Sequence, residues 1–284
     1  MASQDDFEKR TYNYLRLAMI GMLIMLTVAV WREHWRTASN CWQGSISAYY
    51  YTPVHAVFIG SLVTIGICMI VLKGQTTLKD VLLNLGGLLA PVVAFVPTPT
   101  ASGCSSQDII ARKAEADVAN NMVAYFAVGG VALLASAIIG RTSKGREKWD
   151  WKQIAGLVTS VVLWLAGIMW FAFWRTSFVG KAHYTAAALL FAIFIVIVFL
   201  STKGQRHLPA KRASERKAFT GFYAGIAVGM CVCLAIGLIW RSSILVIETL
   251  LLVFFALYWA LRTAEQWRAG GDGDPEEPAE LTKS

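Results

Sequence analysis

The residues of this sequence that could do chemistry are the few polar side chains that interrupt long apolar stretches. Glu248 is the only acidic residue well inside such a stretch, and His55 and His183 each stand at the start of another. Imidazole and carboxylate groups are suitable ligands for zinc or iron, and they also form a suitable acid and base pair. His55, His183 and Glu248 are therefore candidate metal ligands and catalytic residues, with Ser47 or a bound water nearby.

Each of these residues also has a structural interpretation. A histidine at a membrane surface commonly acts as an amphipathic anchor, and Glu248 could join helices through hydrogen bonds, since a carboxylate in hydrocarbon must be paired, solvated or protonated. The sequence contains no GxxxxGK[ST], HExxH, CxxC or GxSxG motif. The sequence therefore identifies neither a reaction nor a cofactor.

The segment before His55 is unusually polar and aromatic, and it reads SISAYYYTP over residues 45–53. Ser47 and the tyrosine hydroxyls could line the mouth of a substrate site. Thr52 and Pro53 favour a second interpretation, in which the segment starts a helix and its tyrosines lie among the lipid headgroups.

The elements that must position these residues are hydrophobic helices. With 56% hydrophobic and 15% charged residues, the chain is too apolar for a surface that faces water. A helix of about 20 apolar residues crosses a hydrocarbon core of about 30 Å. Stretches of about this length cover residues 16–31, 54–72, 80–96, 121–140, 154–173, 183–200, 219–240 and 243–261. The sequence predicts an all-α, polytopic bundle of about eight spans over residues 16–262, between a cytoplasmic segment 1–15 and a disordered cytoplasmic tail 263–284.

The distribution of lysine and arginine predicts that both termini are cytoplasmic. Most of the 26 Lys and Arg residues fall in the terminal segments and alternate loops that this orientation places in the cytoplasm. The net charge of +8 is then explained by topology and by contact with anionic lipid headgroups. No nucleic-acid-binding module is present, so the expected partner is the lipid bilayer and not nucleic acid. The sequence identifies no protein partner.

Two of the five cysteines fall in the long loops on the predicted external side. Cys41 precedes the second span and Cys104 follows the third, in a compartment that permits disulfides. We predict a bridge between them, with two free thiols as the alternative.

The seventh span contains three glycines at a spacing of four residues, Gly221, Gly225 and Gly229. This spacing puts them on one face of a helix and predicts close packing against a neighbouring helix. A hinge is the alternative interpretation.

Several segments together resemble a family of uncharacterised multi-pass membrane proteins of actinobacteria. They read SISAYYYTPVHAVFIGSLVTIGICMIVLKG after Cys41, DVLLNLGGLLAPVVAFVPTP before Cys104, and GKAHYTAAALLFAIF and IETLLLVFFALYW later in the chain. The resemblance implies a bacterial plasma membrane and no particular activity. A looser similarity links the chain to membrane hydrolases such as alkaline ceramidases, but Ala187 stands where their HxxxH pair would place a second histidine after His183, so their metal site is not carried over.

Three classes of function are compatible with these features. A non-enzymatic scaffold or partner-binding protein is favoured because no reactive motif is visible. A small-solute or ion transporter would use the intramembrane acid and the glycine-rich helices. A metal-dependent lipid hydrolase at the outer leaflet would require His55, His183 and Glu248 to converge.

Overall fold

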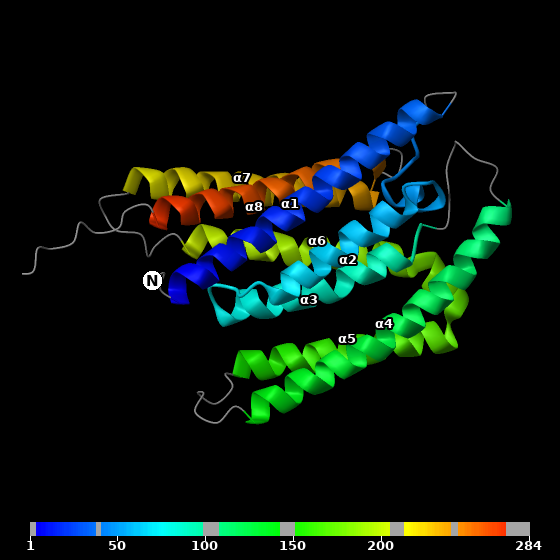
Figure 1. Cartoon of the computed structure of the whole chain (residues 1–284), viewed down its shortest axis with the longest axis horizontal. Helices are drawn as coiled ribbons and strands as arrows, with labels where there is room; N and C mark the ends of the chain where they lie inside the picture. The colour runs from blue at the N-terminus through cyan, green and yellow to red at the C-terminus, as the bar shows by residue number, and fades with distance from the viewer. Residues whose placement is uncertain are drawn as a thin grey trace, which may run out of the picture.

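The structure, a computed structural model, describes residues 4–37, 41–98, 108–142, 151–204, 213–239 and 244–270, and all its regular elements there are helical. In chain order they are α1 (Gln4–Arg36), the 3₁₀ helix η1 (Ser47–Tyr51), α2 (His55–Val71), α3 (Thr77–Phe95), α4 (Asp108–Thr142), α5 (Trp151–Phe173), α6 (Arg175–Gly204), α7 (Ala213–Ile239) and α8 (Ile244–Gly270). Figure 1 shows that the long helices run roughly along one direction. The predicted all-α polytopic bundle is confirmed.

Within the described residues, seven helices are long and apolar enough to cross a membrane, and α2 is a shorter apolar helix of 17 residues. Several helices are longer than the apolar stretches that predicted them. α1 has 33 residues and therefore a length of about 50 Å at 1.5 Å per residue. An apolar window undercounts such helices because backbone hydrogen bonding continues into the polar residues at each end.

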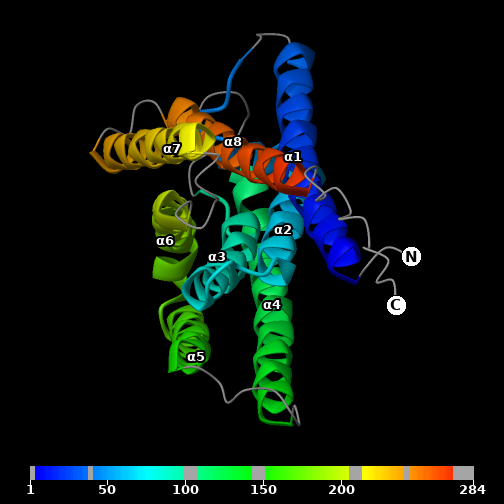
Figure 2. The ribbon, with the colours of Figure 1, turned by 90° about the vertical axis from the view of Figure 1, so that its left-hand side faces the viewer.

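Six helices form a closed ring in which each contacts the next: α1, α2, α3, α6, α7, α8 and α1 again. Figure 2 shows these six helices around a common interior. The α4–α5 pair lies outside the ring, where α5 contacts α3 and α6 and α4 contacts α3. An interior site is therefore lined mainly by the ring helices.

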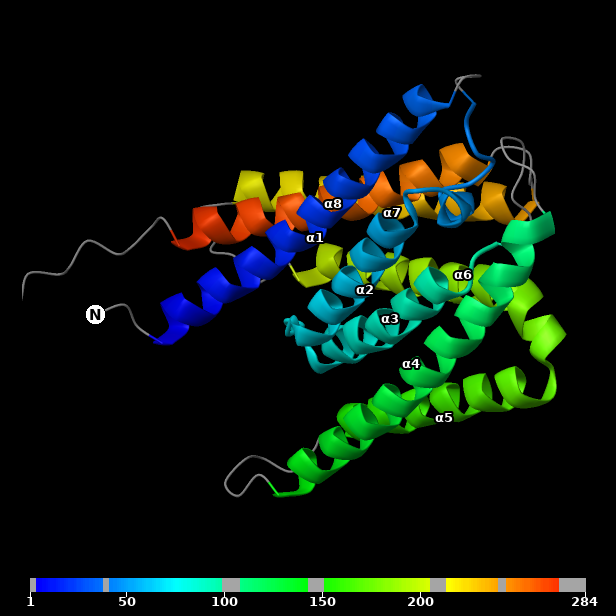
Figure 3. The ribbon, with the colours of Figure 1, turned by 45° about the vertical axis from the view of Figure 1, so that its right-hand side comes forward.

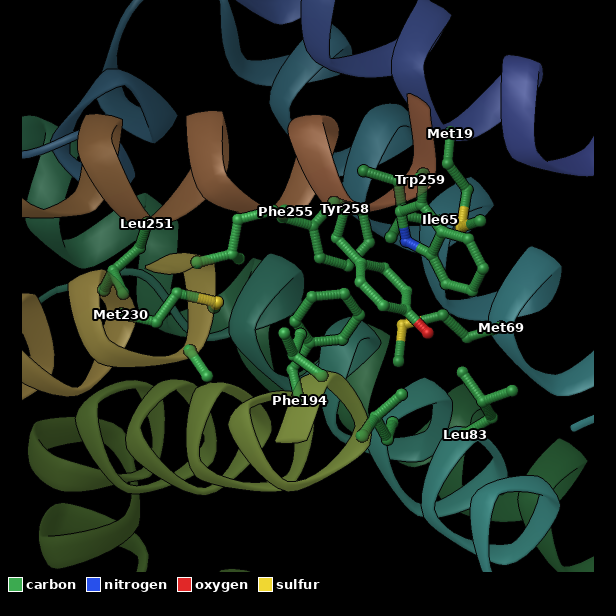
Figure 4. Packing of buried hydrophobic residues seen from close by; sticks show 14 of the residues in the cluster. Met19, Ile65, Met69, Leu83, Phe194, Met230, Leu251, Phe255, Tyr258 and Trp259 are labelled. Carbon is green, nitrogen blue, oxygen red and sulfur yellow. The ribbon is translucent and has the colours of Figure 1, made fainter. Parts of the chain in front are cut away.

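An apolar core fills part of the ring interior. Figure 4 shows side chains from all six ring helices meeting there, among them Met19 of α1, Met69 of α2, Leu83 of α3, Phe194 of α6, Met230 of α7 and Phe255 of α8. The α2 and α3 backbones approach each other closely, because an added Cβ on Gly66 would lie 2.8 Å from the Gly87 carbonyl oxygen. Glycine is needed at this crossing.

The predicted packing of the α7 glycines is only partly present. A Cβ on Gly229 would meet the Phe254 ring of α8 at 2.5 Å, so this glycine does pack closely. For Gly221 and Gly225 the prediction is wrong within this chain, because nothing lies within 4 Å of the position that a Cβ would take. Both are exposed, so this part of the glycine face points away from the neighbouring helices.

The predicted disulfide stays a prediction, because Cys104 lies outside the described residues. Cys68, Cys231 and Cys233, the cysteines inside spans, are free thiols.

Candidate functional site: a cavity inside the helix ring

A cavity of about 160 Å³ lies inside the ring and is lined by α1, α2, α3, α6, α7, α8 and η1. Most lining side chains are apolar, for example Leu26, Phe58, Val93, Phe191, Leu234 and Leu251. Polar lining groups come from Ser47, His183, Tyr184 and Glu248. Three of the four residues proposed from the sequence as catalytic candidates therefore line one cavity.

The polar lining residues gather at one end of the bundle, where α3 ends and α2, α6 and α8 begin. Glu248 is in the first turns of α8, Ser47 begins η1, and His183 bonds the last residues of α3. We call this the outer end, because the charge pattern predicts that it is external. Figure 3 shows η1 beside the start of α8 at this end.

Glu248 holds the start of η1. Its Oε2 accepts a hydrogen bond from the Ile46 backbone N–H at 2.6 Å, and the carboxylate also accepts from the Ser47 backbone N–H. A second link joins the same segments, since the Leu245 N–H donates to the Gly44 carbonyl at 3.1 Å. A carboxylate at the start of a short helix satisfies N–H groups that have no partner within that helix. Glu248 therefore has a structural role, although its partner is η1 and not a neighbouring long helix.

His183 is held by the end of α3. Its Nδ1 lies 2.7 Å from the Val96 carbonyl oxygen and 3.1 Å from that of Val93. Carbonyl oxygens only accept, so Nδ1 must carry the proton that is donated to them. In a neutral ring Nε2 is then an acceptor, and no hydrogen-bond partner for Nε2 is found among the described residues. The side chain is buried, yet it borders the cavity.

The Ser47 hydroxyl is directed toward the segment that follows α3 and not toward His183. Its Oγ donates to the Thr98 Oγ1 at 3.0 Å and lies 3.3 Å from the Ser45 Oγ. The Tyr51 hydroxyl donates to the Thr98 carbonyl at 2.9 Å. Thr98 therefore anchors η1 from the other side, a role that its position after the third span did not reveal.

His55 is separate from the other candidates. Its Nδ1 lies 2.7 Å from the Tyr50 carbonyl oxygen, its ring packs against the Tyr50 ring at 4.1 Å, and it is not a lining residue of the cavity. Among the described residues no three His, Cys, Asp or Glu side chains are close enough to hold a metal ion. The geometry therefore does not assemble His55, His183 and Glu248 as a metal centre.

Both interpretations of residues 45–53 describe part of the structure. Ser47 lines the cavity, and Thr52 Oγ1 accepts from the Val54 N–H at the approach to α2. Tyr49 and Tyr50 are buried and are therefore not headgroup anchors. Burial raises the pKa of Tyr49, Tyr50 and Tyr51, so all three keep their protons at neutral pH.

The opposite end of the ring contains a buried polar network. The Lys79 ammonium donates to the Ser201 hydroxyl at 3.1 Å, and that hydroxyl lies 3.1 Å from the Tyr258 hydroxyl. Glu265 accepts from Tyr223 at 2.8 Å and pairs with Arg262. The apolar core that includes Phe194 and Phe255 lies between the cavity and this network.

Comparisons with protein-family models, with curated proteins and with solved structures found no match to this chain. The fold and the seven long apolar helices define the class, an integral, multi-pass membrane protein.

Proposed function

We propose that this integral membrane protein is a non-enzymatic binding protein whose ligand is a long-chain amphiphile. The apolar chain occupies the cavity inside the helix ring and the head group lies at the outer end. The observation that carries the proposal is the cavity itself, which is apolar over most of its length and has its polar lining groups at one end. From the resemblance to actinobacterial proteins, we also propose a bacterial plasma membrane as the location.

The size of the cavity suits part of an alkyl chain. A dry cavity of about 150 Å³ lined by aliphatic and aromatic side chains binds benzene. A chain that moves from the bilayer into such a cavity gains little hydrophobic free energy, because lipid tails are as apolar as leucine. Packing and head-group contacts must then provide the selectivity.

The arrangement of polar groups favours binding over hydrolysis. A serine nucleophile needs its hydroxyl within hydrogen-bond reach of a base, whereas the Ser47 proton is directed to Thr98. The His183 ring is fixed by Val93 and Val96, in a position where Nε2 can accept from a ligand.

The apolar core favours binding over transport. A small-solute or ion transporter needs a polar path across the bilayer. In the described part of the ring, core residues such as Met69, Phe194 and Phe255 close the inner side of the cavity.

A pair of substitutions at adjacent residues of α6 tests the proposal. Ala188 lines the cavity, whereas Leu189 is 43% exposed and is not a lining residue. Ala188→Trp should reduce photolabelling of the purified protein by a diazirine-bearing C16 alcohol at least about tenfold, because the added indole fills space that the chain needs. Leu189→Trp should leave the labelling unchanged. Equal labelling of Ala188→Trp and wild type, with both variants folded by circular dichroism, would contradict the proposal.

A further inference from the structure

The polar end of the cavity offers hydrogen-bond acceptors without a lysine or arginine side chain. Its lining residues include Glu248 and His183 but no lysine or arginine. The buried cations Arg16, Lys79 and Arg262 belong to the network at the opposite end and are not lining residues. A head group at the outer end therefore meets a carboxylate, an imidazole and the hydroxyl-bearing residues Ser47 and Tyr184, with no lysine or arginine in the lining.

Glu248 and His183 differ in the number of acceptor positions that remain available to a ligand. The Glu248 carboxylate accepts from Ile46 and Ser47, and a carboxylate has about four acceptor positions, so about two remain. His183 is committed through Nδ1 to two carbonyl oxygens, which leaves Nε2 as an acceptor in the neutral ring. Neither acceptor can be satisfied by a head group that lacks N–H or O–H.

We infer that the cavity selects an amphiphile whose head group donates hydrogen bonds, a primary ammonium or a hydroxyl, over one with an anionic or non-donating head group. The inference rests on the proposed function and adds the chemical class of the ligand.

Electrostatics and hydrogen bonding support the same selection. An anionic head group would lie beside the Glu248 carboxylate in an apolar cavity, where water screens the repulsion poorly. A primary ammonium would be attracted there and could also donate to His183 Nε2. A hydroxyl would donate without a charge, and a quaternary ammonium would have the charge without a donor. Comparing the binding of these four head groups therefore distinguishes the effect of charge from the effect of hydrogen bonding.

The test is a competition among C16 amphiphiles that differ only in the head group: hexadecylamine, hexadecanol, hexadecanoic acid and hexadecyltrimethylammonium. Each competes with the diazirine-bearing C16 alcohol for the full-length protein in nanodiscs of neutral lipid, at equal mole fraction in the membrane. The amine or the alcohol should compete at least about tenfold better than the acid and the quaternary ammonium, as expected for hydrogen bonds to a charged group. A difference between amine and alcohol shows whether the positive charge adds to the hydrogen bond.

Glu248→Gln removes the charge and keeps one acceptor oxygen. It should weaken competition by the amine about tenfold and weaken competition by the alcohol less. Thr249→Ser, one residue further on the exposed side of α8, is the matched control and should change neither.

The outcomes separate the two proposals. Equal competition by the acid or the quaternary ammonium would overturn the head-group inference and leave the amphiphile proposal intact. Unchanged competition by the amine in Glu248→Gln would overturn the role of Glu248 in selection. Failure of all four compounds to compete would overturn the head-group inference and the proposed function together.

Discussion

Glu265→Ala is expected to lower the free energy of unfolding by about 3 to 5 kcal/mol, the cost of removing one partner of a buried ion pair. Arg262 forms an ion pair with Glu265. The negative charge of Glu265 also acts electrostatically on Arg16 and Lys79. All three cations are at most 5% exposed, so without Glu265 their positive charge stays buried with less compensation. The Tyr223 hydroxyl would also lose its acceptor.

Thermal unfolding of the purified protein in a mild detergent measures this loss. Glu33→Ala is the control, since Glu33 forms an ion pair of the same i, i+3 spacing with Arg36, whose side chain is 58% exposed. The control should lose much less stability, because water can solvate the remaining cation. Similar losses for both variants would show that Glu265 is not the main counter-charge of the buried cations.

Glu248→Ala is expected to release the segment that η1 occupies. The substitution leaves the backbone N–H groups of Ile46 and Ser47 without their acceptor, and each such loss costs about 1 to 3 kcal/mol. Amide hydrogen exchange at these two residues should accelerate about 5- to 150-fold, with little change in the amides of the core helices.

Thr249→Ala is the matched control for this experiment. The Thr249 hydroxyl bonds only its own helix in the described structure, at the Leu245 carbonyl, so exchange in η1 should not change. Unaltered exchange at Ile46 and Ser47 in Glu248→Ala would mean that Thr98 and the Leu245–Gly44 bond hold η1 without the carboxylate.

The helices were predictable because long apolar stretches without charge have few alternatives to a membrane-spanning helix. The structure at the polar ends of these helices was not predictable. Arg16, Lys79 and Arg262 lie at or directly beside the ends of predicted spans, yet all three are buried at the end of the ring opposite the outer end. α8 likewise continues to Gly270, through part of the predicted tail 263–284. A charged residue just beyond an apolar stretch still lies on the helix, and the sequence does not say whether that helix face points inward.

The candidate site was predictable residue by residue but not as an arrangement. Glu248 and His183 stood out because polar groups in apolar stretches are costly. Their positions on one cavity, and the separation of His55, depend on how η1, α6 and α8 pack. The polar and aromatic run at 45–53 was the available signal for η1, but nothing in the sequence connected it to Glu248 or Thr98.

The most direct test of the amphiphile cavity is the position of the covalent label. Wild-type protein labelled with the C16 diazirine alcohol and digested should have its saturable label on cavity-lining residues of α6 and α8, between His183 and Phe194 and between Ile247 and Phe255. The predicted result is that an excess of hexadecanol removes the label from these segments, while label on α4 and α5, outside the ring, stays. Label confined to lipid-facing positions, with none that competes at the cavity, would contradict the account.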